Sequence, residues 1–599
     1  MADQASNSLR IDTSNEPPTP PILALFLVNF DHRKGYTLGW HKSVDDVPVE
    51  NVVEFKSLPS GLHNVEQDLV YFIHDDYAGL SAFINKADEQ ADRAARMLAV
   101  GALVPLEHGR MGRIWRHAQS LVELSSAQID NPGSVTALEE YWEKYKLRPE
   151  EAAPQTPLES GEEDPTRRPN GYQKSRTMSA ATTFIQPHHA LTPHHPALTL
   201  VDSIKLFGPL IFPLYRAALL RRRILIVTDA PVEFCCNLGE HETVTPTCHT
   251  LTVEVYNLSI LSSVSKSLLP HDVDLPAARL RALFTVGVMD IPQLEQARAA
   301  GSNHGFIACT TDDVLTSKPD LYDILVLMPK AGLQAASGKV FPRIIVSSPE
   351  LTKAFPKVSI KATQRDFRRF ANLMRGLRRI EPSETAVTDD EASSVSSLSS
   401  SNSTNKLVVE PPSWSRMAYT SFVWWASAGD RREGFAEGEE HEIERDSTLL
   451  YGEDEEEQSR EVAVVAYFHR LTATIFQTVT AAISRADGST EAEGRYHDND
   501  DDDDTDSNFN DQMGQQDSQP LLAEQAAEAN IEINHEDMLD MGLDSWSASD
   551  KRFVEALSML WWERQATTHS TIDSPNAARL SFSLVTLAEV SVVTMTSIS

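Results

Sequence analysis

Short runs of apolar residues recur along the first part of the chain, and these runs predict strands. Three stretches, at 22–28, 68–73 and 97–100, have the length and composition of buried strands. The tripeptide Lys34-Gly35-Tyr36 follows the first of them and marks a turn. From 109 to 129 the apolar residues instead recur at intervals of three or four, which is the helical period. This order predicts a sheet backed by helices over residues 22–148.

A second alternation of helices and short apolar strands runs over residues 200–380 and predicts an α/β layer fold. Its most informative stretch is an amphipathic helix that begins at Ser203 and contains Phe207-Gly208-Pro209. The helix ends in Arg221-Arg222-Arg223, and the apolar strand 224–227 follows at once.

The last helix of this region, at 363–379, has an apolar face and a strongly basic side. Its arginines are Arg365, Arg368, Arg369, Arg375, Arg378 and Arg379. We expect part of this basic side to face solvent, because the apolar face occupies the rest of the helix surface. A cationic face on an acidic protein would suit an acidic partner surface or anionic lipid, and the alternative is a solvated helix surface.

Four segments of this second region resemble a DENN domain. They are the helix-to-strand segment 203–227 and the segments 283–292, 305–313 and 321–326. Together they resemble the LCHN-type branch of DENN-domain proteins, including its fungal members with a C-terminal extension. The resemblance implies a bilobed module, with a longin-like uDENN lobe at 22–148 and a DENN α/β lobe at 200–380.

Composition marks the linkers around these lobes. Residues 1–20 are predicted to be disordered, 149–199 to be a linker rich in Pro and Thr, and 381–410 to be a Ser-rich linker. The histidine pairs at 188–189 and 194–195 are interpreted as parts of a polar loop, because no periodic structure would fix a metal-binding geometry there.

The C-terminal third predicts a small helical extension. Residues 411–485 begin with a dense aromatic stretch and continue as a helix at 461–485. An acidic, disordered segment is predicted at 486–535, a small helical block at 536–565, and a tail that departs from the family pattern at 566–599. The predicted fold class is therefore α/β, a bilobed DENN module with disordered linkers and a small helical C-terminal extension.

One segment interrupts the second lobe. In the family pattern, the residues around Cys235 and Cys236 continue directly into the helix that begins at Val255. Joining Asn237 to Val255 places the apolar residues at helical spacing, whereas the intervening sequence is polar and Thr-rich. Residues 238–254 are therefore interpreted as an insertion, and an intron retained in the gene model is one proposed origin.

Net charge and cysteine content exclude some classes of partner and indicate the compartment of the protein. The formal net charge of -34 argues against duplex nucleic acid as a partner, because phosphate binding needs clustered Lys and Arg. Four cysteines in 599 residues do not form a secreted disulfide framework, so we expect a reducing compartment. The N-terminus lacks a basic signal-peptide region, and no run reaches about 18 consecutive apolar residues. We therefore expect a cytoplasmic protein whose membrane contact is peripheral. The resemblance implies that this contact is on endosomal or other vesicle membranes.

No catalytic constellation is expected. The segment 332–340 resembles a phosphate loop, but five residues separate its glycines and Val340 stands where a magnesium-binding hydroxyl is required. The sequence contains no GxSxG, HExxH or CxxC motif, and its Asp run lacks the glycine turn of an EF-hand. We expect no catalytic residues, no cofactor and no bound metal.

The resemblance implies a guanine nucleotide exchange factor for a Rab-family, or Arf-family, small GTPase in membrane trafficking. The alternative is a non-catalytic adaptor that binds the GTP-loaded GTPase as an effector. A third hypothesis, in which the longin-like lobe pairs with another longin protein to activate GTP hydrolysis, would need an arginine finger and has little support in the sequence.

In the family the GTPase docks across both lobes, which implies a contact surface that involves the N-terminal lobe and the loops around the second lobe's sheet. The candidate contact residues are Phe207, Gly208, Pro209, Arg221, Arg222, Arg223, Thr310, Thr311 and Asp312. Each group also has a structural alternative: a turn for Gly208-Pro209, partners of the helix C-terminus for the arginines, and an N-cap for Thr311 or Asp312.

Overall fold

The computed structural model describes residues 19–31, 33–44, 47–58, 66–87, 95–106, 111–148, 195–228, 250–270, 280–299, 305–329, 340–347, 359–380, 408–411, 413, 416–417, 433–451, 459–496 and 530–568. Several predicted segments lie outside these residues. They are most of the linkers, residues 238–249 of the proposed insertion, the phosphate-loop-like segment 332–339, most of the aromatic stretch, the Asp run and most of the tail.

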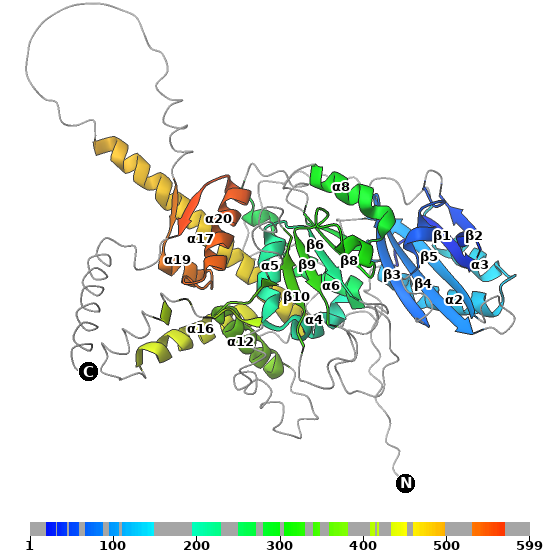
Figure 1. Ribbon diagram of the computed structural model, residues 1–599, viewed down its shortest axis with the longest axis horizontal. Helices are drawn as coiled ribbons and strands as arrows, with labels where there is room; N and C mark the ends of the chain where they lie inside the picture. The colour runs from blue at the N-terminus through cyan, green and yellow to red at the C-terminus, as the bar shows by residue number, and fades with distance from the viewer. Residues whose placement is uncertain are drawn as a thin grey trace, which may run out of the picture.

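In the described part of the chain, eleven strands form one sheet that runs through both lobes (Figure 1). The N-terminal strands are β1 (Ala24–Asp31), β2 (Gly35–Ser43), β3 (Gln67–His74), β4 (Tyr77–Ala87) and β5 (Ala95–Pro105). The second lobe contributes β6 (Ile224–Val227), β7 (Arg281–Thr285), β8 (Phe306–Thr310), β9 (Ile324–Leu327), β10 (Arg343–Val346) and β11 (Ser359–Ile360). The order across the sheet is β11-β10-β9-β6-β8-β7-β3-β4-β5-β1-β2.

The two halves of the sheet differ in strand direction. The N-terminal strands pair antiparallel throughout, whereas β6 pairs parallel with β8 and β9, and β7 with β8. The two halves of the sheet join through the antiparallel pair β3 and β7, where Phe72 lies opposite Phe284. Phe284 has a φ of 59°, in the left-handed region that bulky residues rarely adopt, at the residue where the parallel register with β8 also shifts.

The parallel strands are buried on both faces, and this explains their continuous apolar sequence. In β6, Ile224 and Ile226 enter the main core, whereas Leu225 and Val227 enter a second core on the opposite face. The helices of this lobe are α4 (Leu200–Phe207), α5 (Ile211–Leu219), α6 (Thr250–Leu261), α8 (Ile291–Ala299), α9 (Asp313–Thr316) and α12 (Gln364–Ile380). The α/β fold predicted from the sequence is confirmed.

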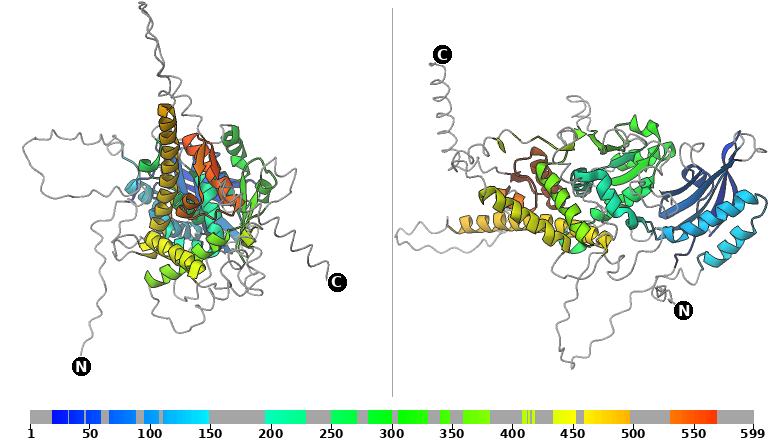
Figure 2. Two further views of the ribbon diagram at one scale, coloured as in Figure 1. Left: turned by 90° about the vertical axis from the view of Figure 1, so that its left-hand side faces the viewer. Right: turned by 90° about the horizontal axis from the view of Figure 1, so that it is seen from below.

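Helices α2 (Ala118–Asp130) and α3 (Thr136–Tyr145) cover one face of the N-terminal sheet, and the short helix α1 (Val53–Lys56) lies on the other side of the lobe (Figure 2). The Ser125 hydroxyl in α2 donates a 2.8 Å hydrogen bond to the Ala82 carbonyl in β4. This bond satisfies a buried polar group where the helix packs on the sheet.

The C-terminal extension packs against the second lobe at the end far from the N-terminal lobe (Figure 1). It contains α16 (Glu433–Tyr451), α17 (Arg460–Tyr496), α19 (His535–Asp540), α20 (Ala548–Trp562) and the parallel strands β12 (Ile531–Ile533) and β13 (Ala566–Thr568). Three predicted boundaries therefore need correction. Helix α17 continues past 485 into the predicted acidic segment, β12 lies inside that segment, and the predicted tail begins with β13.

Two further boundaries also need correction. Helix α6 begins at Thr250, so the last five residues of the proposed insertion belong to a core helix in which Val253 and Glu254 are buried. His195, assigned to a polar linker, is buried with its ring 4.8 Å from that of Trp115, and its Nδ1 accepts a hydrogen bond from the Ala197 amide. Burial lowers the pKa of His195 to about 4, which is the behaviour of a core histidine.

Candidate functional site

Exposed apolar side chains gather where the two lobes meet. Of the ten large apolar residues exposed in the described part of the chain, five lie in this region. They are Tyr36, Phe55, Val288, Met289 and Val314, and Met289 is the most exposed at 62%. We call these five residues the inter-lobe patch. Apolar side chains that both lobes expose together are typical of a protein contact surface.

The carboxyl ends of β7 and β8 supply the second lobe's share of the patch. These strands are parallel, so the segments that follow them leave the sheet at the same edge. After β7, a tight turn is closed by Asp290, whose carboxylate accepts a 2.9 Å hydrogen bond from the Gly287 amide. Because Val288 and Met289 lie between these two residues, the turn holds their side chains outward.

Helix α1 supplies the N-terminal lobe's share. The Glu54 carboxylate accepts hydrogen bonds from the amides of Asn51 and Val52, at 3.1 and 3.0 Å, and so fixes the start of the helix. The next residue, Phe55, is 45% exposed and its ring lies edge-on to Tyr36, with the centroids 6.4 Å apart. The two aromatic rings therefore form one continuous part of the patch.

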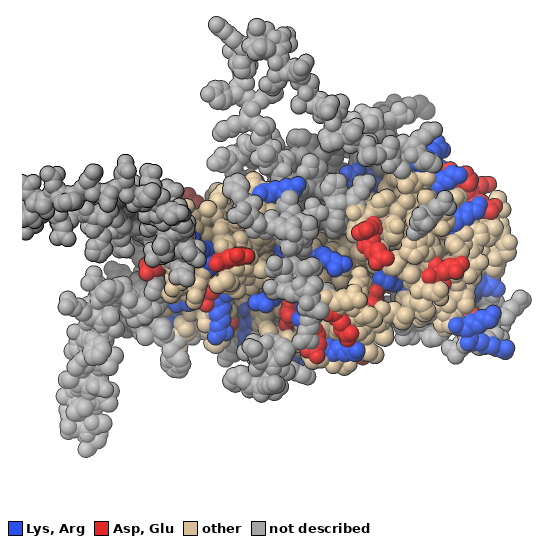
Figure 3. Space-filling model, turned by 90° about the horizontal axis from the view of Figure 1, so that it is seen from above, with Lys and Arg blue, Asp and Glu red and all other residues tan. Residues whose placement is uncertain are grey.

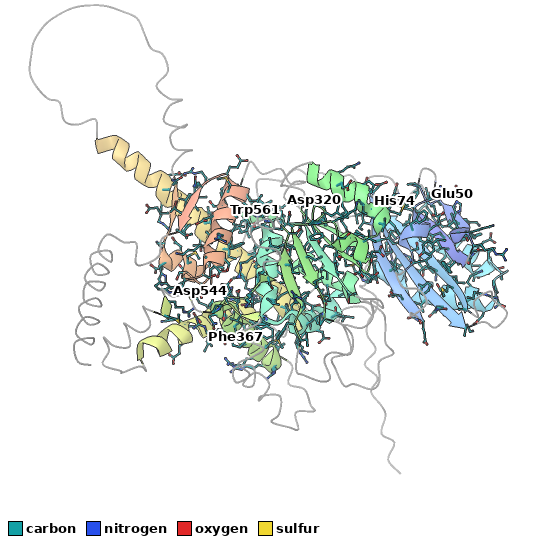
Figure 4. All side chains as sticks on the ribbon, in the orientation of Figure 1. Glu50, His74, Asp320, Phe367, Asp544 and Trp561 are labelled. Carbon is teal, nitrogen blue, oxygen red and sulfur yellow. The ribbon has the colours of Figure 1, made fainter. Side chains whose placement is uncertain are left out.

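A buried ion pair connects the two lobes beneath the patch. The Lys56 ammonium lies 2.6 Å from the Asp290 carboxylate and donates a 2.9 Å hydrogen bond to the Ile73 carbonyl. His74 lies at the same boundary (Figure 4). Burial is the main cause that lowers its pKa, with a smaller contribution from Lys56, while Asp75 and Asp290 oppose the shift. This ion pair, together with the continuous sheet, holds the two halves of the patch in one arrangement.

Charge around the patch is mixed. Burial, followed by the negative charge of Asp312, raises the pKa of Tyr36 above its ordinary value. Seen from above, the described basic and acidic side chains are interspersed over the molecule (Figure 3). In the described residues, no group of three or more His, Cys, Asp or Glu side chains is placed to hold a metal ion.

One stretch in the described part of the chain, Pro196–Leu219, is long and apolar enough to cross a membrane. Most of it is buried inside the protein, in the helical layer formed by α4 and α5. A core helix passes the same test of length and composition.

The first group of predicted contact residues is buried and needs correction. Phe207 is 1% exposed, and Gly208 and Pro209 are also buried. Gly208 has a φ of +57°, and a Cβ at this position would overlap the ring of Phe341. These residues make the turn between α4 and α5, as the structural alternative held, and cannot contact a partner docked on this conformation.

The second group lies at the opposite edge of the sheet. Arg221 is buried, donates a 2.9 Å hydrogen bond to the Ala218 carbonyl at the end of α5, and lies 4.9 Å from the ring centre of Trp561. Arg223 is paired with Asp323 at 2.6 Å, and only Arg222 is exposed. The three arginines precede β6, whereas the patch follows the carboxyl ends of β7 and β8, so the structure does not bring these groups together.

The third group lies beside the patch. Thr310 is buried, and its hydroxyl accepts a 3.1 Å hydrogen bond from the Asp312 amide. Thr311 and Asp312 are partly exposed next to Val314. Of the predicted contact residues, these two are the ones that the structure places at the inter-lobe surface together with exposed apolar side chains.

None of the five residues of the inter-lobe patch is among the predicted contact residues. Val288 and Met289 lie in the turn between β7 and a proline-containing helix start, so an apolar pair in a turn was the available signal. The expectation that part of the basic side of 363–379 faces solvent is confirmed. Arg365 and Arg369 are buried against α16, whereas Arg375, Arg378 and Arg379 are exposed.

These features define a two-lobed module of the DENN type with a candidate protein-docking surface between the lobes. A family model described as DENN domain-containing protein 11 matches residues 25–337, more than half of the chain. The chain therefore belongs to the DENN domain-containing protein 11 family. DENN domains in general associate with small GTPases and are known as Rab exchange-type modules. A second model, a domain of unknown function (DUF4484), matches residues 409–573.

Individual relatives match in two ways. DENN domain-containing protein 11 of Xenopus laevis is 32% identical over 51% of this chain and 59% of its own length. The Danio rerio protein of the same name is 30% identical over 51% of this chain and 53% of its own length. An uncharacterized Saccharomyces cerevisiae protein, ANR2, is 23% identical over 91% of this chain and 92% of its own length. The chain thus spans little more than half of the animal relatives that it matches, and nearly all of the yeast one.

Proposed function

We propose that this protein is a guanine nucleotide exchange factor for a Rab-family small GTPase in membrane trafficking. The observation that supports the proposal most is the inter-lobe patch, a set of exposed apolar residues drawn from both lobes of a DENN-type module. A surface of this kind suits a globular protein partner better than a small molecule, because it is exposed and not enclosed.

An exchange factor needs no covalent chemistry. It binds a state of the GTPase that holds nucleotide poorly. By reciprocity, if bound nucleotide weakens the binding of the exchange factor to the GTPase, the exchange factor weakens the binding of nucleotide by the same factor. A GTPase that holds GDP with nanomolar to picomolar affinity has about 12 to 16 kcal/mol of binding free energy to be offset in part. A protein interface of roughly 1,600 Å² can supply several kcal/mol if it displaces the switch regions from phosphate and magnesium.

The structure suggests how the two lobes would share this work. Tyr36 and Phe55 offer a rigid aromatic surface on one side, and Val288 and Met289 offer a projecting apolar turn on the other. Because the Lys56–Asp290 ion pair holds the lobes together, a GTPase docked on both sides would meet a preorganised surface.

Release of fluorescent GDP from a panel of Rab and Arf-family GTPases tests the proposal. We expect the full chain to accelerate release from one of them and Met289→Asp to reduce this acceleration by about tenfold or more, because a charge would be placed at the centre of the contact. Met559→Asp is the matched control, since Met559 is 50% exposed on α20, in the extension. Equal activity of the two variants would refute the proposed surface.

The same assay separates the alternative function. GTP-dependent binding without any change in release rate would favour a non-catalytic effector or adaptor. A variant that lacks the proposed insertion should omit only 238–249, because residues 250–254 form the start of α6. Activity only in this variant would mean that the insertion blocks exchange.

We further propose that the protein is cytoplasmic and contacts endosomal or other vesicle membranes peripherally. The proposal rests on the exchange function, since the GTPases of membrane trafficking act at membrane surfaces. Fractionation of cells expressing the full chain is the test, and recovery in the membrane pellet after high-salt and alkaline washes would contradict peripheral association.

A further inference from the structure

The second lobe buries more positive than negative charge at the surface that faces the extension. Arg216 in α5 and Arg365 and Arg369 in α12 are each between 2% and 6% exposed. We call these three residues the arginine cluster. Among the described residues of this lobe, one deeply buried carboxylate, that of Asp366, pairs with the cluster, and it binds Arg216 through two hydrogen bonds of 2.8 and 2.7 Å.

The extension supplies the missing negative charge. The Asp446 carboxylate of α16 accepts two 3.0 Å hydrogen bonds from Arg365 and one of 3.3 Å from Arg369. The Asp550 carboxylate of α20 lies 3.2 Å from Arg216. With the extension in place, three deeply buried guanidinium groups face three deeply buried carboxyl groups. Removing one of these carboxylates while the extension stays in place would leave a buried guanidinium without its partner, which is strongly unfavourable.

Buried apolar and polar contacts surround the cluster. Phe468 in α17 stacks on Phe212 at 5.7 Å, and the Tyr215 hydroxyl lies 2.6 Å from that of Thr472, with both groups buried. Trp561 donates a 3.3 Å hydrogen bond from its indole nitrogen to the Leu219 carbonyl, and it lies where α20 meets α5 (Figure 4).

Backbone contacts are equally close. The amide of Ala362 donates to the Val408 carbonyl at 2.9 Å, and the Glu410 amide donates back to Ala362 at 2.8 Å. A Cβ at Gly542 would overlap the guanidinium of Arg369, and Gly542 has a φ of +66°. At Gly542 the extension therefore approaches the lobe too closely for a side chain to fit.

We propose that residues 408–568, most of which match the domain of unknown function, are an intramolecular partner of the DENN lobe that neutralises the arginine cluster. The helix that carries Phe212, Tyr215 and Arg216 belongs to the segment that most resembles a DENN domain, so the extension covers a diagnostic part of the lobe. The described part of the extension packs at the end of the molecule away from the inter-lobe patch (Figure 1). This role does not depend on nucleotide exchange activity.

Cleavage of the folded full chain tests the proposal. A protease site placed between 381 and 407 would separate the lobes from the extension in sequence without removing either. We expect the two pieces to remain together in size-exclusion chromatography at micromolar concentration. High salt should have little effect, because buried ion pairs are only weakly screened. Separation of the wild-type pieces would overturn the proposal.

A matched pair of variants tests the charge argument. Burial raises the pKa of Asp550 to about 7, so Asp446 is the better position to change. Asp446→Asn should weaken association of the cleaved pieces by about 100-fold or more, which is the factor expected when one partner of a buried ion pair is lost. Glu444→Gln removes an exposed carboxylate from the same helix and should change nothing. Equal association of the two variants would overturn the role of Asp446. If Asp446→Asn fails to fold, the association of the cleaved wild-type pieces still tests the proposal.

Discussion

Replacing Glu254 with Gln tests how one buried carboxyl group controls the dependence of stability on pH. Glu254 lies in α6, is 4% exposed, and accepts a 2.9 Å hydrogen bond from the Ser203 hydroxyl. Burial raises its pKa from 4.5 to about 8, while the Ser203 bond opposes the shift and Asp202 adds to it. Between these two pH values the folded chain holds a proton that the unfolded chain has released.

This difference determines the sign and the magnitude of the effect. Because the folded state binds the extra proton, the free energy of unfolding falls as the pH rises from 4.5 to about 8. One pKa unit corresponds to about 1.4 kcal/mol, so the full change amounts to roughly 5 kcal/mol as an upper limit. Gln has a similar shape and stays neutral, so the variant lacks this loss. Its advantage over the wild-type chain should grow with pH and become constant above about 8.

Thermal unfolding of both proteins in matched buffers between about pH 5 and pH 9 measures this advantage as a difference in Tm. Burial lowers the pKa of His117 and His195 to about 4, which makes stability rise with pH, but both proteins share this contribution and it cancels in the difference. Glu140→Gln changes an exposed carboxylate in α3 and serves as the control. A difference in Tm between Glu254→Gln and wild type that is the same at both ends of the range would refute the reasoning.

Two further substitutions test how the lobes are held. Lys56→Met should destabilise the protein by about 3 kcal/mol, because it leaves the Asp290 carboxylate buried without its cation, and urea unfolding at neutral pH measures the loss. A loss below about 0.5 kcal/mol would mean that the continuous sheet alone holds the lobes together. Gly208→Ala should cost at least about 2 kcal/mol, through its positive φ and overlap with Phe341. Gly133→Ala has open space and should be nearly neutral in the same assay, and similar losses in both glycine variants would contradict the role assigned to the turn.

Local sequence patterns predicted a strand or helix correctly where the residues of that element alone determine its structure. The apolar run at 224–227 predicts β6 because a parallel strand buried on both faces must be apolar throughout. The helical spacing at 363–379 likewise predicts α12 to within one residue at each end. The end of the insertion was misplaced at Glu254 because a buried polar side chain that bonds to another helix looks, in sequence, like part of a polar segment.

The candidate site could not be predicted in the same way. Phe207-Gly208-Pro209 is distinctive in sequence because it forms a buried turn. Without the fold, residues that are needed to form a turn look the same as residues that are needed to contact a partner. Met289 and Phe55 are ordinary apolar residues in sequence, and only their exposure at one inter-lobe boundary makes them a candidate surface.

The sequence by itself determined the order and type of most elements, the α/β class and the family, because periodicity, turn residues and local motifs act over a few neighbouring positions. The tertiary structure alone decided that Phe72 pairs with Phe284 and joins two lobes in one sheet, and that Asp446 neutralises Arg365 and Arg369. These pairs lie far apart in the chain, and a carboxylate or a phenyl ring carries no local signal of the partner that folding will bring to it.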